Sequence, residues 1–388
     1  ISIVGIMVGV MALIVVLSVM KGFEVDLREK ILGANAHMVV LKFGGRIKEY
    51  HKVIKEVEKV EGVVAATPYI YNQVMLMFRG RSVGVVMKGI DVVSIDKVTA
   101  LSEKIIEGSL QSLKIPFKSE AFPGILIGKE LAASLGVLEG DTVDALTAVG
   151  SPTPFGMLPN RVTFRISGIF DFGMYEYDSS LTFISLENAQ RFFNMGNDVT
   201  GIEMKAEEIY MAKETGIRVA DALETNLGEY YLVKNWMELN KNLFAALKLE
   251  RLAMFIILAL IVLVAAFNII STLIMVVVEK GREIAVLISM GATKKSIMKI
   301  FMIEGMVMGI IGTALGVTGG LILDILLVKY PIIKLPEDVY NMDTLPVIIE
   351  PSIFLTVSLA ALVISFLATL YPSWQASRLD PVEALRHE

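Results

Sequence analysis

The sequence contains no cysteine, and only three histidines stand among its 388 residues. The absence of cysteine excludes disulfides, thiol chemistry and cysteine-ligated metals. His37, His51 and His387 do not have metal-ligand spacing, so we expect no metal site. The nearest match to a phosphate-binding loop, "IGKEL" at 127–131, lacks the Ser/Thr after its lysine and the upstream glycine. The sequence therefore predicts a non-catalytic chain without a cofactor, and ATP would be bound by another polypeptide.

Charged residues make up 20% of the chain but are absent from four long stretches, 1–20, 252–278, 305–323 and 351–377. A helix of roughly 20 apolar residues spans a bilayer, so we predict four transmembrane helices. The first stretch leads straight into "KGFEVDLREK" without a small-residue cleavage site, which favours a retained helix over a signal peptide. Because the first residue is isoleucine inside this stretch, we expect the natural N-terminus to be missing.

The distribution of Lys and Arg predicts the orientation. Short loops rich in these residues remain in the cytoplasm, and Lys280, Arg282, Lys294 and Lys295 all lie between the second and third spans. We therefore place this loop and the C-terminal tail in the cytoplasm, and the large domain on the other side. The predicted order is transmembrane helix 1 at 1–20, an external domain at 21–250, helix 2 at 252–278, a cytoplasmic loop at 279–298, helix 3 at 300–328, an external loop at 329–350, helix 4 at 351–372 and a cytoplasmic tail at 373–388.

The domain between the first two spans has a mixed α+β pattern. Residues 36–42, 68–78 and 81–91 alternate like strands, whereas 47–60, 186–195 and 209–227 have helical periodicity. Another helix, 235–254, is expected to run directly into the second span. The fold class is thus a membrane protein with four transmembrane α-helices and a large external α+β domain inserted between helices 1 and 2.

One loop of this domain, "AVGSPTPFGMLPNRV" at 148–162, combines three prolines with three large apolar residues. Proline stiffens a loop and blocks a continued strand ladder. Large apolar side chains at a rigid tip are costly in water unless another surface covers them. Either the loop folds back on its own domain, or it is a protruding arm for a protein partner.

Small and polar residues within the spans suggest close helix packing. A row of glycines at spacings of three or four lets another helix approach, either within one subunit or at a dimer seam. Asn268 is expected to make an interhelical hydrogen bond. Glu304 and Asp324 are expected to be solvated near the two ends of the third span. The glycine row consists of Gly305, Gly309, Gly312, Gly316 and Gly320.

The stretch "EKGREIAVLISMGATKKSIMKIF" at 279–301 separates the second and third spans. Ile284, Leu287 and Ile288 follow helical spacing, and a Gly-Ala-Thr break comes at 291–293. We predict a helix of about eight to ten residues by this periodicity. It would rest on lipid or in a protein groove, and the acids and bases at 279–283 favour the groove.

Several stretches resemble the lipoprotein-releasing ABC permeases of the LolC/LolE family, within the MacB/FtsX-like permease superfamily. They are "MALIVVLSVMKGFEVDLREKILG", "SGIFDFGMYEYDSSLTFISL", the segment 265–305 and "YPSWQASRLDPVEALRHE". The resemblance covers essentially the whole chain, and its first two stretches are the most specific. It implies a complex of two permease subunits, like or unlike, with an ABC ATPase dimer in the inner membrane of a Gram-negative-type cell. The complex would extract acylated lipoproteins from the outer leaflet and pass them to a periplasmic carrier.

The resemblance also implies a division of the large domain into two parts and three sets of site residues. The domain would consist of a porter-like part, 35–115 and 196–240, and an inserted lobe, 116–195. The ATPase-coupling residues would be Glu279, Arg282, Glu283, Val286, Leu287, Met290, Gly291 and Ala292. The carrier-binding arm would contain Pro154, Phe155, Met157, Pro159 and Arg161. The lipid cavity would be lined by Leu13, Val16, Leu17, Met20, Leu258 and Phe267.

Two other functions have the same predicted topology. A MacB-like exporter would move drugs or peptides, and an FtsX-like mechanotransmitter would move no cargo but regulate a periplasmic hydrolase. The net charge of −5 and the lack of a basic run give no indication of nucleic-acid binding. The sequence leaves open whether the chain is of the LolC type, the LolE type or a homodimeric subunit.

Overall fold

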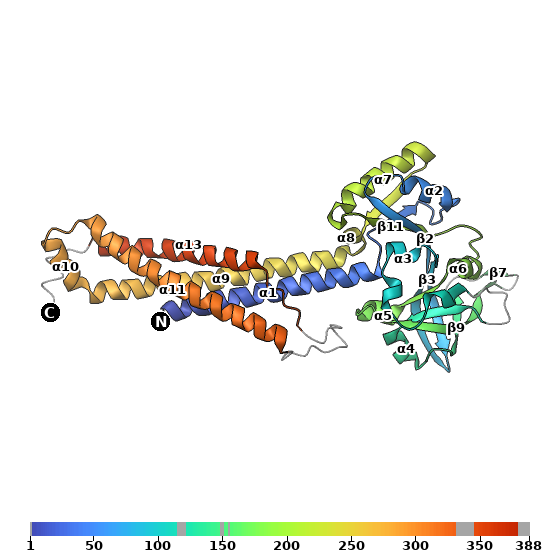
Figure 1. Ribbon diagram of the computed structural model, residues 1–388, viewed down its shortest axis with the longest axis horizontal. Coiled ribbons are helices and arrows are strands. Elements are labelled where there is room, and N and C mark those ends of the chain that lie inside the picture. The colour runs from blue at the N-terminus through green and yellow to red at the C-terminus, as the bar shows by residue number, and fades with distance from the viewer. Residues whose placement is uncertain (1, 115–121, 148–150, 154–155, 331–344, 379–388) are drawn as a thin grey trace. The chain divides into compact units, whose positions relative to one another are not determined.

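The computed structural model describes residues 2–114, 122–147, 151–153, 156–330 and 345–378 (Figure 1). Contacts divide the chain into two compact units. The helical unit comprises Ile1–Asp26, Ala245–Lys334 and Thr344–Glu388. The sheet unit comprises Leu27–Phe244.

Four long helices account for the charge-free stretches: α1 (Ser2–Ala34), α9 (Lys241–Glu279), α11 (Lys294–Lys329) and α13 (Pro351–Ala376). Within the described part of the chain, these four are long and apolar enough to cross a membrane. A shorter helix, α10 (Gly281–Ser289), lies between α9 and α11. Helix α1 continues past the predicted span 1–20, because the charged segment after it is rich in Leu, Glu, Lys and Arg, which favour helix.

The glycine row of α11 packs against two neighbours in the same chain. A Cβ on Gly305 or Gly309 would clash with Thr369 or Ser365 of α13. The next three glycines face α1 instead, and a Cβ on Gly316 would lie 2.7 Å from the Cβ of Val10. All five glycines are buried within the chain. Of the two explanations for the row, packing within one subunit is therefore confirmed.

The sheet unit is built on one 10-stranded sheet among the described residues. The strand order is β12-β1-β11-β2-β3-β10-β5-β9-β4, with β6 pairing with both β2 and β9. Most pairs are antiparallel, whereas β10–β3 and β5–β9 are parallel. The strands are β1 (Met38–Lys42), β2 (Val63–Phe78), β3 (Arg81–Ile90), β4 (Ile105–Gly108), β5 (Gly124–Gly128), β6 (Thr142–Thr147), β9 (Arg161–Phe170), β10 (Leu181–Ser185), β11 (Gly201–Ala206) and β12 (Tyr231–Asn235).

Short helices cover this sheet, with α2 and α7 close together at one end and α4 and α5 at the other (Figure 1). The α-helices are α2 (Tyr50–Val57), α3 (Ile95–Val98), α4 (Lys129–Leu135), α5 (Tyr175–Ser180), α6 (Leu186–Phe192), α7 (Ala212–Leu227) and α8 (Trp236–Leu239). The 3-10 helices are η1 (Leu101–Lys104), η2 (Leu110–Lys114) and η3 (Ile209–Met211). Two main apolar cores and a small third cluster result, and the smaller of the two main cores contains Phe170, Phe172 and Phe183.

The long strand β2 joins the two ends of the sheet, because it pairs with β11, β3 and β6. Lys88 of β3 and Glu203 of β11 form an ion pair of 2.6 Å across it, with side-chain exposures of only 4% and 6%. The predicted porter-like part and inserted lobe contribute strands to this same sheet.

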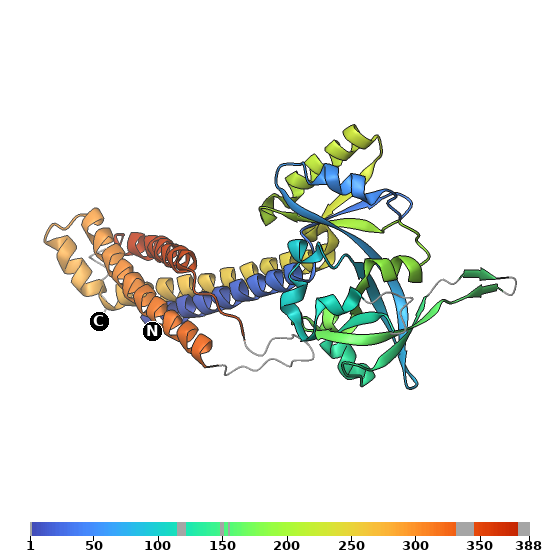
Figure 2. The ribbon, with the colours of Figure 1, turned by 45° about the vertical axis from the view of Figure 1, so that its right-hand side comes forward.

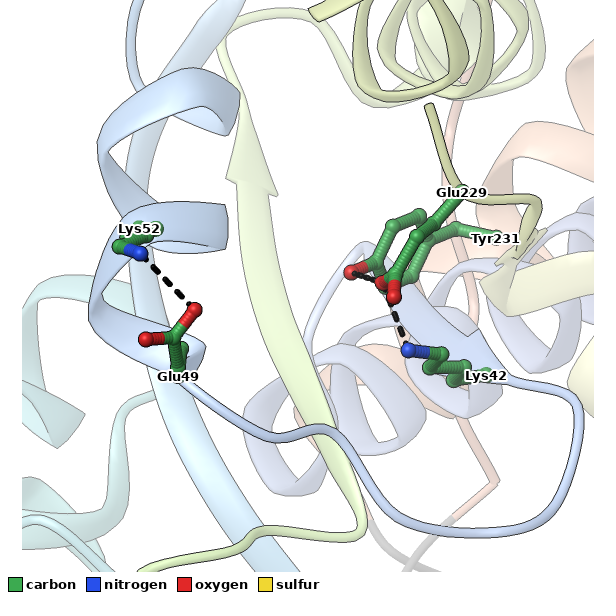
Figure 3. A network of polar contacts seen from close by, with 5 residues as sticks. All are labelled: Lys42, Glu49, Lys52, Glu229 and Tyr231. Atoms are coloured by element: carbon green, nitrogen blue, oxygen red, sulfur yellow. Dashed lines mark hydrogen bonds and ion pairs between the residues drawn. The ribbon is translucent and has the colours of Figure 1, made fainter. Parts of the chain in front are cut away.

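A second polar contact ties the edge strand β12 to β1 (Figure 3). Lys42 Nζ lies 2.6 Å from Glu229, which also accepts a hydrogen bond of 2.7 Å from the Tyr231 hydroxyl. Burial, together with the bond to Glu229, raises the pKa of Tyr231. In the same view, Lys52 pairs with Glu49 at the start of α2.

Local geometry shortened two predicted helices. Within the predicted helix 47–60, Ile47 instead bridges Val199, and Glu49 has a left-handed φ of 48°, so α2 begins at Tyr50. The predicted helix 235–254 is interrupted at Asn240, which separates α8 from α9. Its continuation into the second span is confirmed, because α9 is one helix from Lys241 to Glu279.

Candidate functional site

The first candidate site is a groove of about 430 Å³ between α1, α9 and the start of α13. Leu17, Met20 and Phe23 of α1 form one wall, and Met254 and Phe255 of α9 form another. Charged side chains lie at the same groove: Lys21, Glu24, Arg251 and Glu350. Arg251 Nη2 and Glu24 Oε1 form an ion pair of 3.0 Å that joins α9 to α1. The groove thus combines an apolar wall with a charged rim.

A second hollow of about 280 Å³ lies along the same three helices. Its lining is almost entirely apolar and includes Ile6, Leu13, Ile261 and Val357. Phe255 lines both this hollow and the groove. The two cavities therefore provide adjoining apolar surfaces on α1, α9 and α13.

The predicted lipid-cavity residues do not all line the same cavity. Leu17 and Met20 line the groove, and Leu13 lines the second hollow. Val16 is half-buried, and Phe267 is 59% exposed on α9. The side chain of Leu258 lies outside the described residues.

Sequence reasoning missed several residues of the groove: Phe23, Glu24, Arg251, Phe255 and Glu350. Three of these five are charged and lie just outside the charge-free stretches. For Phe23 and Glu24, the signal that could have found them is the continuation of the helix beyond the first predicted span. With 3.6 residues per turn, the residues that follow Met20 return to the same face of the helix.

Polar groups also lie inside the helical unit. The Ser2 hydroxyl donates to the backbone carbonyl of Asn268 and is also hydrogen-bonded to the Thr272 hydroxyl, and these bonds join α1 to α9. The Asn268 side chain lies against Gly5, where a Cβ would come within 2.7 Å of its amide nitrogen. Asn268 thus takes part in the interhelical bonding through its backbone carbonyl, and the predicted hydrogen bond of its side-chain amide stays a prediction.

The prediction that Asp324 is solvated is wrong. Its exposure is 0%, and Ser18 of α1 is the polar side chain beside it. Neither carboxylate oxygen has a hydrogen-bond partner among the described residues. The physical reason is the glycine row, which draws α11 so close to α1 that Asp324, one turn after Gly320, is enclosed as well. Glu304, at the other end of α11, is half-buried.

The second candidate site is α10 with the residues on either side of it. Ile284 and Ala285 are buried, and Ile284 and Ile288 pack against Ile297 and Phe301 of α11. Gly291 ends the segment with a left-handed φ of 102°, and Ala292 packs against the same apolar cluster as Ile288. The predicted short helix with a glycine break is confirmed.

The outer face of α10 is more apolar than its charges suggest. Val286, Leu287 and Met290 are exposed, Met290 by 72%. Leu287 belongs to the helix that its spacing predicts, and its side chain is exposed whereas that of Ile284 is buried. Exposed charges surround these residues: Glu279, Arg282 and Glu283, with Lys280 pairing to Glu283 at 2.6 Å. This surface, 279–292, has the apolar centre and polar rim of a protein interface.

The third candidate site is a hairpin formed by β7 (Ser151–Thr153) and β8 (Gly156–Leu158). Among the described residues, the two strands pair only with each other, with Pro152 opposite Met157. Figure 2 shows both strands standing away from the large sheet. Pro154 and Phe155 lie outside the described residues, as does the side chain of Met157.

The base of the hairpin is held firmly. Asn160 donates to Thr147 Oγ1 at 3.0 Å through its backbone and to the Phe192 carbonyl at 3.2 Å through its side chain. Arg161 forms an ion pair of 2.6 Å with Asp144, and this bond is the main reason why the pKa of Asp144 is lowered. Pro159 is exposed and lines a shallow groove of about 620 Å³ on β2, β3 and β6.

Within the described residues, no cluster of three or more His, Asp or Glu side chains could hold a metal ion.

Comparison with known proteins identifies the family. Residues 1–222 match the MacB-like periplasmic core domain, and residues 255–381 match the FtsX-like permease C-terminal domain. The chain is 37% identical over its full length to the lipoprotein-releasing system transmembrane protein LolC of Xylella fastidiosa (strain 9a5c), covering 93% of that protein. It is 34% identical to LolC of Neisseria meningitidis serogroup B, over 100% of this chain and 94% of that one.

Among solved structures, the periplasmic region of MacB from Actinobacillus actinomycetemcomitans matches 55% of this chain and 94% of that one, with a TM-score of 0.36 and 13% identity. The family assignment comes instead from the match to LolC proteins over the whole chain and from the two domain matches. The chain belongs to the LolC/LolE family of lipoprotein-releasing transmembrane proteins, within the FtsX-like permeases.

Proposed function

We propose that this chain is the permease subunit of an ATP-driven complex that extracts acylated lipoproteins from the outer leaflet of the inner membrane. The complex passes them to a periplasmic carrier for sorting to the outer membrane. The observation that carries this proposal is the 37% identity to a lipoprotein-releasing protein over the full chain. Hydrolysis of ATP belongs to a separate ABC ATPase dimer, and a second permease subunit, like or unlike, completes the complex.

The groove between α1 and α9 suits an acylated peptide. Leu17, Met20 and Phe255 present an apolar wall, while Lys21 and Arg251 stand beside it. An acyl chain that moves from lipid to such a wall exchanges one apolar surrounding for another. Exposing the chain to water instead costs about 0.8 kcal/mol for each CH₂ group. The cargo is therefore kept covered until a carrier is docked.

The two other sites face opposite sides of the membrane in this proposal. The positively charged loop 279–298 places α10 in the cytoplasm, where Val286, Leu287 and Met290 contact the ATPase. The sheet unit is then periplasmic, and its hairpin β7–β8 recruits the carrier. Closure of the ATPase dimer moves α10, and with it α9 and α11, which narrows the lipid-binding groove.

A reconstituted release assay tests this function. The purified complex in proteoliposomes is supplied with a labelled acylated lipoprotein, carrier and ATP, and lipoprotein bound to soluble carrier is measured. A photoreactive residue at Met20 is expected to crosslink the cargo, whereas one at Val4, exposed on the same helix, is not. Release that requires neither ATP nor this chain would overturn the proposal.

The same assay separates the two other functions. Transport of a drug or peptide without release of lipoprotein would indicate a MacB-like exporter. Activation of a periplasmic hydrolase without any transported cargo would indicate an FtsX-like mechanotransmitter.

A further inference from the structure

The last turns of α1 belong to the sheet unit, and two tyrosines from different parts of that unit hold them. The Arg28 guanidinium bonds to the hydroxyl of Tyr210 in η3, and its carbon lies 5.6 Å from the centre of that ring. Asn35, just after α1, donates its side-chain amide to the hydroxyl of Tyr177 in α5 at 2.7 Å. The end of α1 therefore contacts both η3, next to α7, and α5, next to β10.

Tyr177 lies in a tightly bonded turn, Asp171 to Ser180. Asp178 is only 1% exposed and accepts hydrogen bonds from the backbone of Phe172 at 2.9 Å and of Met174 at 3.1 Å. Asp171 accepts one from Gly173 at 2.8 Å. Gly173 has a left-handed φ of 70°, which favours glycine. These hydrogen bonds hold the backbone of the turn in place, and with it the position of Tyr177.

The Tyr177 ring is packed against the smaller core of the sheet unit. It meets Phe172 edge-on with a centroid distance of 6.4 Å, and Phe172 contacts Phe170 and Phe183. These side chains come from β9, β10 and the loop between them. The ring therefore connects its hydroxyl group rigidly to this part of the sheet.

A second contact joins the turn to α1. A Cβ on Gly173 would lie 3.5 Å from Cε of Lys30, which shows that the Lys30 side chain passes directly over the turn. Lys30 and Asn35 thus contact the same turn from two positions along α1. A rotation of the helix would displace both contacts together.

We propose that the turn 171–180 transmits movement of α1 to β9 and β10, with Tyr177 as the positioning residue and Asp178 as the residue that holds the turn. This inference rests on the proposed function, because α1 also lines the groove through Leu17 and Met20. As α1 is one continuous helix from Ser2 to Ala34, a rotation at the groove reaches Asn35. The turn converts that rotation into movement of the sheet, and so couples extraction of cargo to its transfer.

The test compares Tyr177→Phe with Tyr230→Phe in the complete complex. Tyr177→Phe removes the hydroxyl that bonds Asn35 but keeps the packed ring; Tyr230→Phe removes a hydroxyl from a ring that is largely exposed. Tyr177→Phe is expected to lower lipoprotein release roughly two- to ten-fold, the range for one hydrogen bond, at unchanged ATP hydrolysis. Asn35→Ala is expected to give the same loss, and the double variant no more than either single variant. Tyr230→Phe is expected to leave both activities unchanged.

Hydrogen–deuterium exchange provides a measurement that needs no cargo. In the wild-type complex, a non-hydrolysable ATP analogue is expected to change exchange in both 27–37 and 171–185. In Tyr177→Phe, the change should persist in 27–37 and be lost in 171–185. The same response in both proteins would overturn the proposal, as would a wild-type complex without any change in 171–185. A complex that hydrolyses ATP but releases no lipoprotein would refute the proposed function, and the exchange experiment would still decide the role of the turn.

Discussion

At the scale of single residues, Asp178 and Asp171 show how two nearby carboxyl groups acquire different properties. Burial raises the pKa of Asp178 to about 6, and the charge of Asp171 adds to this effect. Burial also acts to raise the pKa of Asp171, but the hydrogen bond from Gly173 and the neighbouring Lys129 lower it overall. The two groups titrate as a pair, with the proton favoured on Asp178.

The raised pKa of Asp178 predicts a pH dependence of stability. The folded state binds this proton more tightly than the unfolded state, so protonation of Asp178 stabilises the fold. This stabilisation is fully present below the pKa of the unfolded state, 3.8, and is lost as pH rises through the folded-state pKa of about 6. The free energy of unfolding of the wild type should therefore fall more between pH 5 and 7 than that of Asp178→Asn. Asparagine keeps one acceptor but directs an NH₂ group at the backbone N–H of Met174, so the variant should also be less stable at pH 5.

The measurement is urea unfolding of the full chain, followed by the fluorescence of buried Trp236 in a Trp374→Phe background, since the chain has two tryptophans. Glu58→Gln, an exposed acid in the same unit, serves as control. Parallel pH curves for the wild type and Asp178→Asn would contradict the prediction.

The sequence predicted the surroundings of some single residues correctly and those of others wrongly. The sequence correctly placed Gly291 at the end of a short helix, because a glycine break is a local signal. It placed Asp324 in solvent, because distance from the end of an apolar stretch gives no information about the neighbouring helix. Asp324 is enclosed only because α1 passes close to α11.

At the scale of elements, the glycine face of α11 sets how closely α1 and α13 approach. We expect Gly316→Val to destabilise the helical unit by about 1–3 kcal/mol, the usual cost of overpacking. The reason is that its Cβ would lie 2.7 Å from Val10 Cβ and 2.8 Å from the Met7 carbonyl, neither of which can move freely. The measurement is loss of helical circular dichroism during titration with sodium dodecyl sulfate.

Gly319→Ala is the matched control on the same helix. Its Cβ would meet the flexible end of Met11, with the sulfur at 3.1 Å. It should therefore cost much less than Gly316→Val. Equal losses in the two variants would mean that the close contact of Gly316 with Val10 and Met7 does not set the stability.

Helix α10 carries the prediction for the ATPase interface. Glu283→Lys should lower copurification of the ATPase at least about ten-fold, as expected when a buried interfacial charge faces the wrong sign. The fold of α10 should survive, because the ion pair with Lys280 is exposed and such pairs contribute little. Glu58→Lys, a charge reversal in the sheet unit, should have no effect, and normal copurification with Glu283→Lys would exclude α10 as the docking helix.

At the scale of the whole molecule, the chain has separate candidate sites for separate partners. Replacing both Phe155 and Pro159 with serine should abolish carrier binding in a pull-down while ATPase copurification stays normal. The reason is that apolar side chains supply the buried centre of a protein interface. Glu283→Lys should give the opposite pattern. Loss of both partners in either variant would contradict this independence.

The four membrane helices, the short helix α10 and the family could be predicted from the sequence by itself. These depend on patterns between near neighbours: long stretches without charge, helical spacing and quoted motifs. Only the tertiary structure decided that Asn35 meets Tyr177, 142 positions away, that β2 joins both ends of one sheet, and that the groove includes Arg251. Such contacts depend on which faces of distant elements fit each other, and the periodicity of one segment holds no information about its partner.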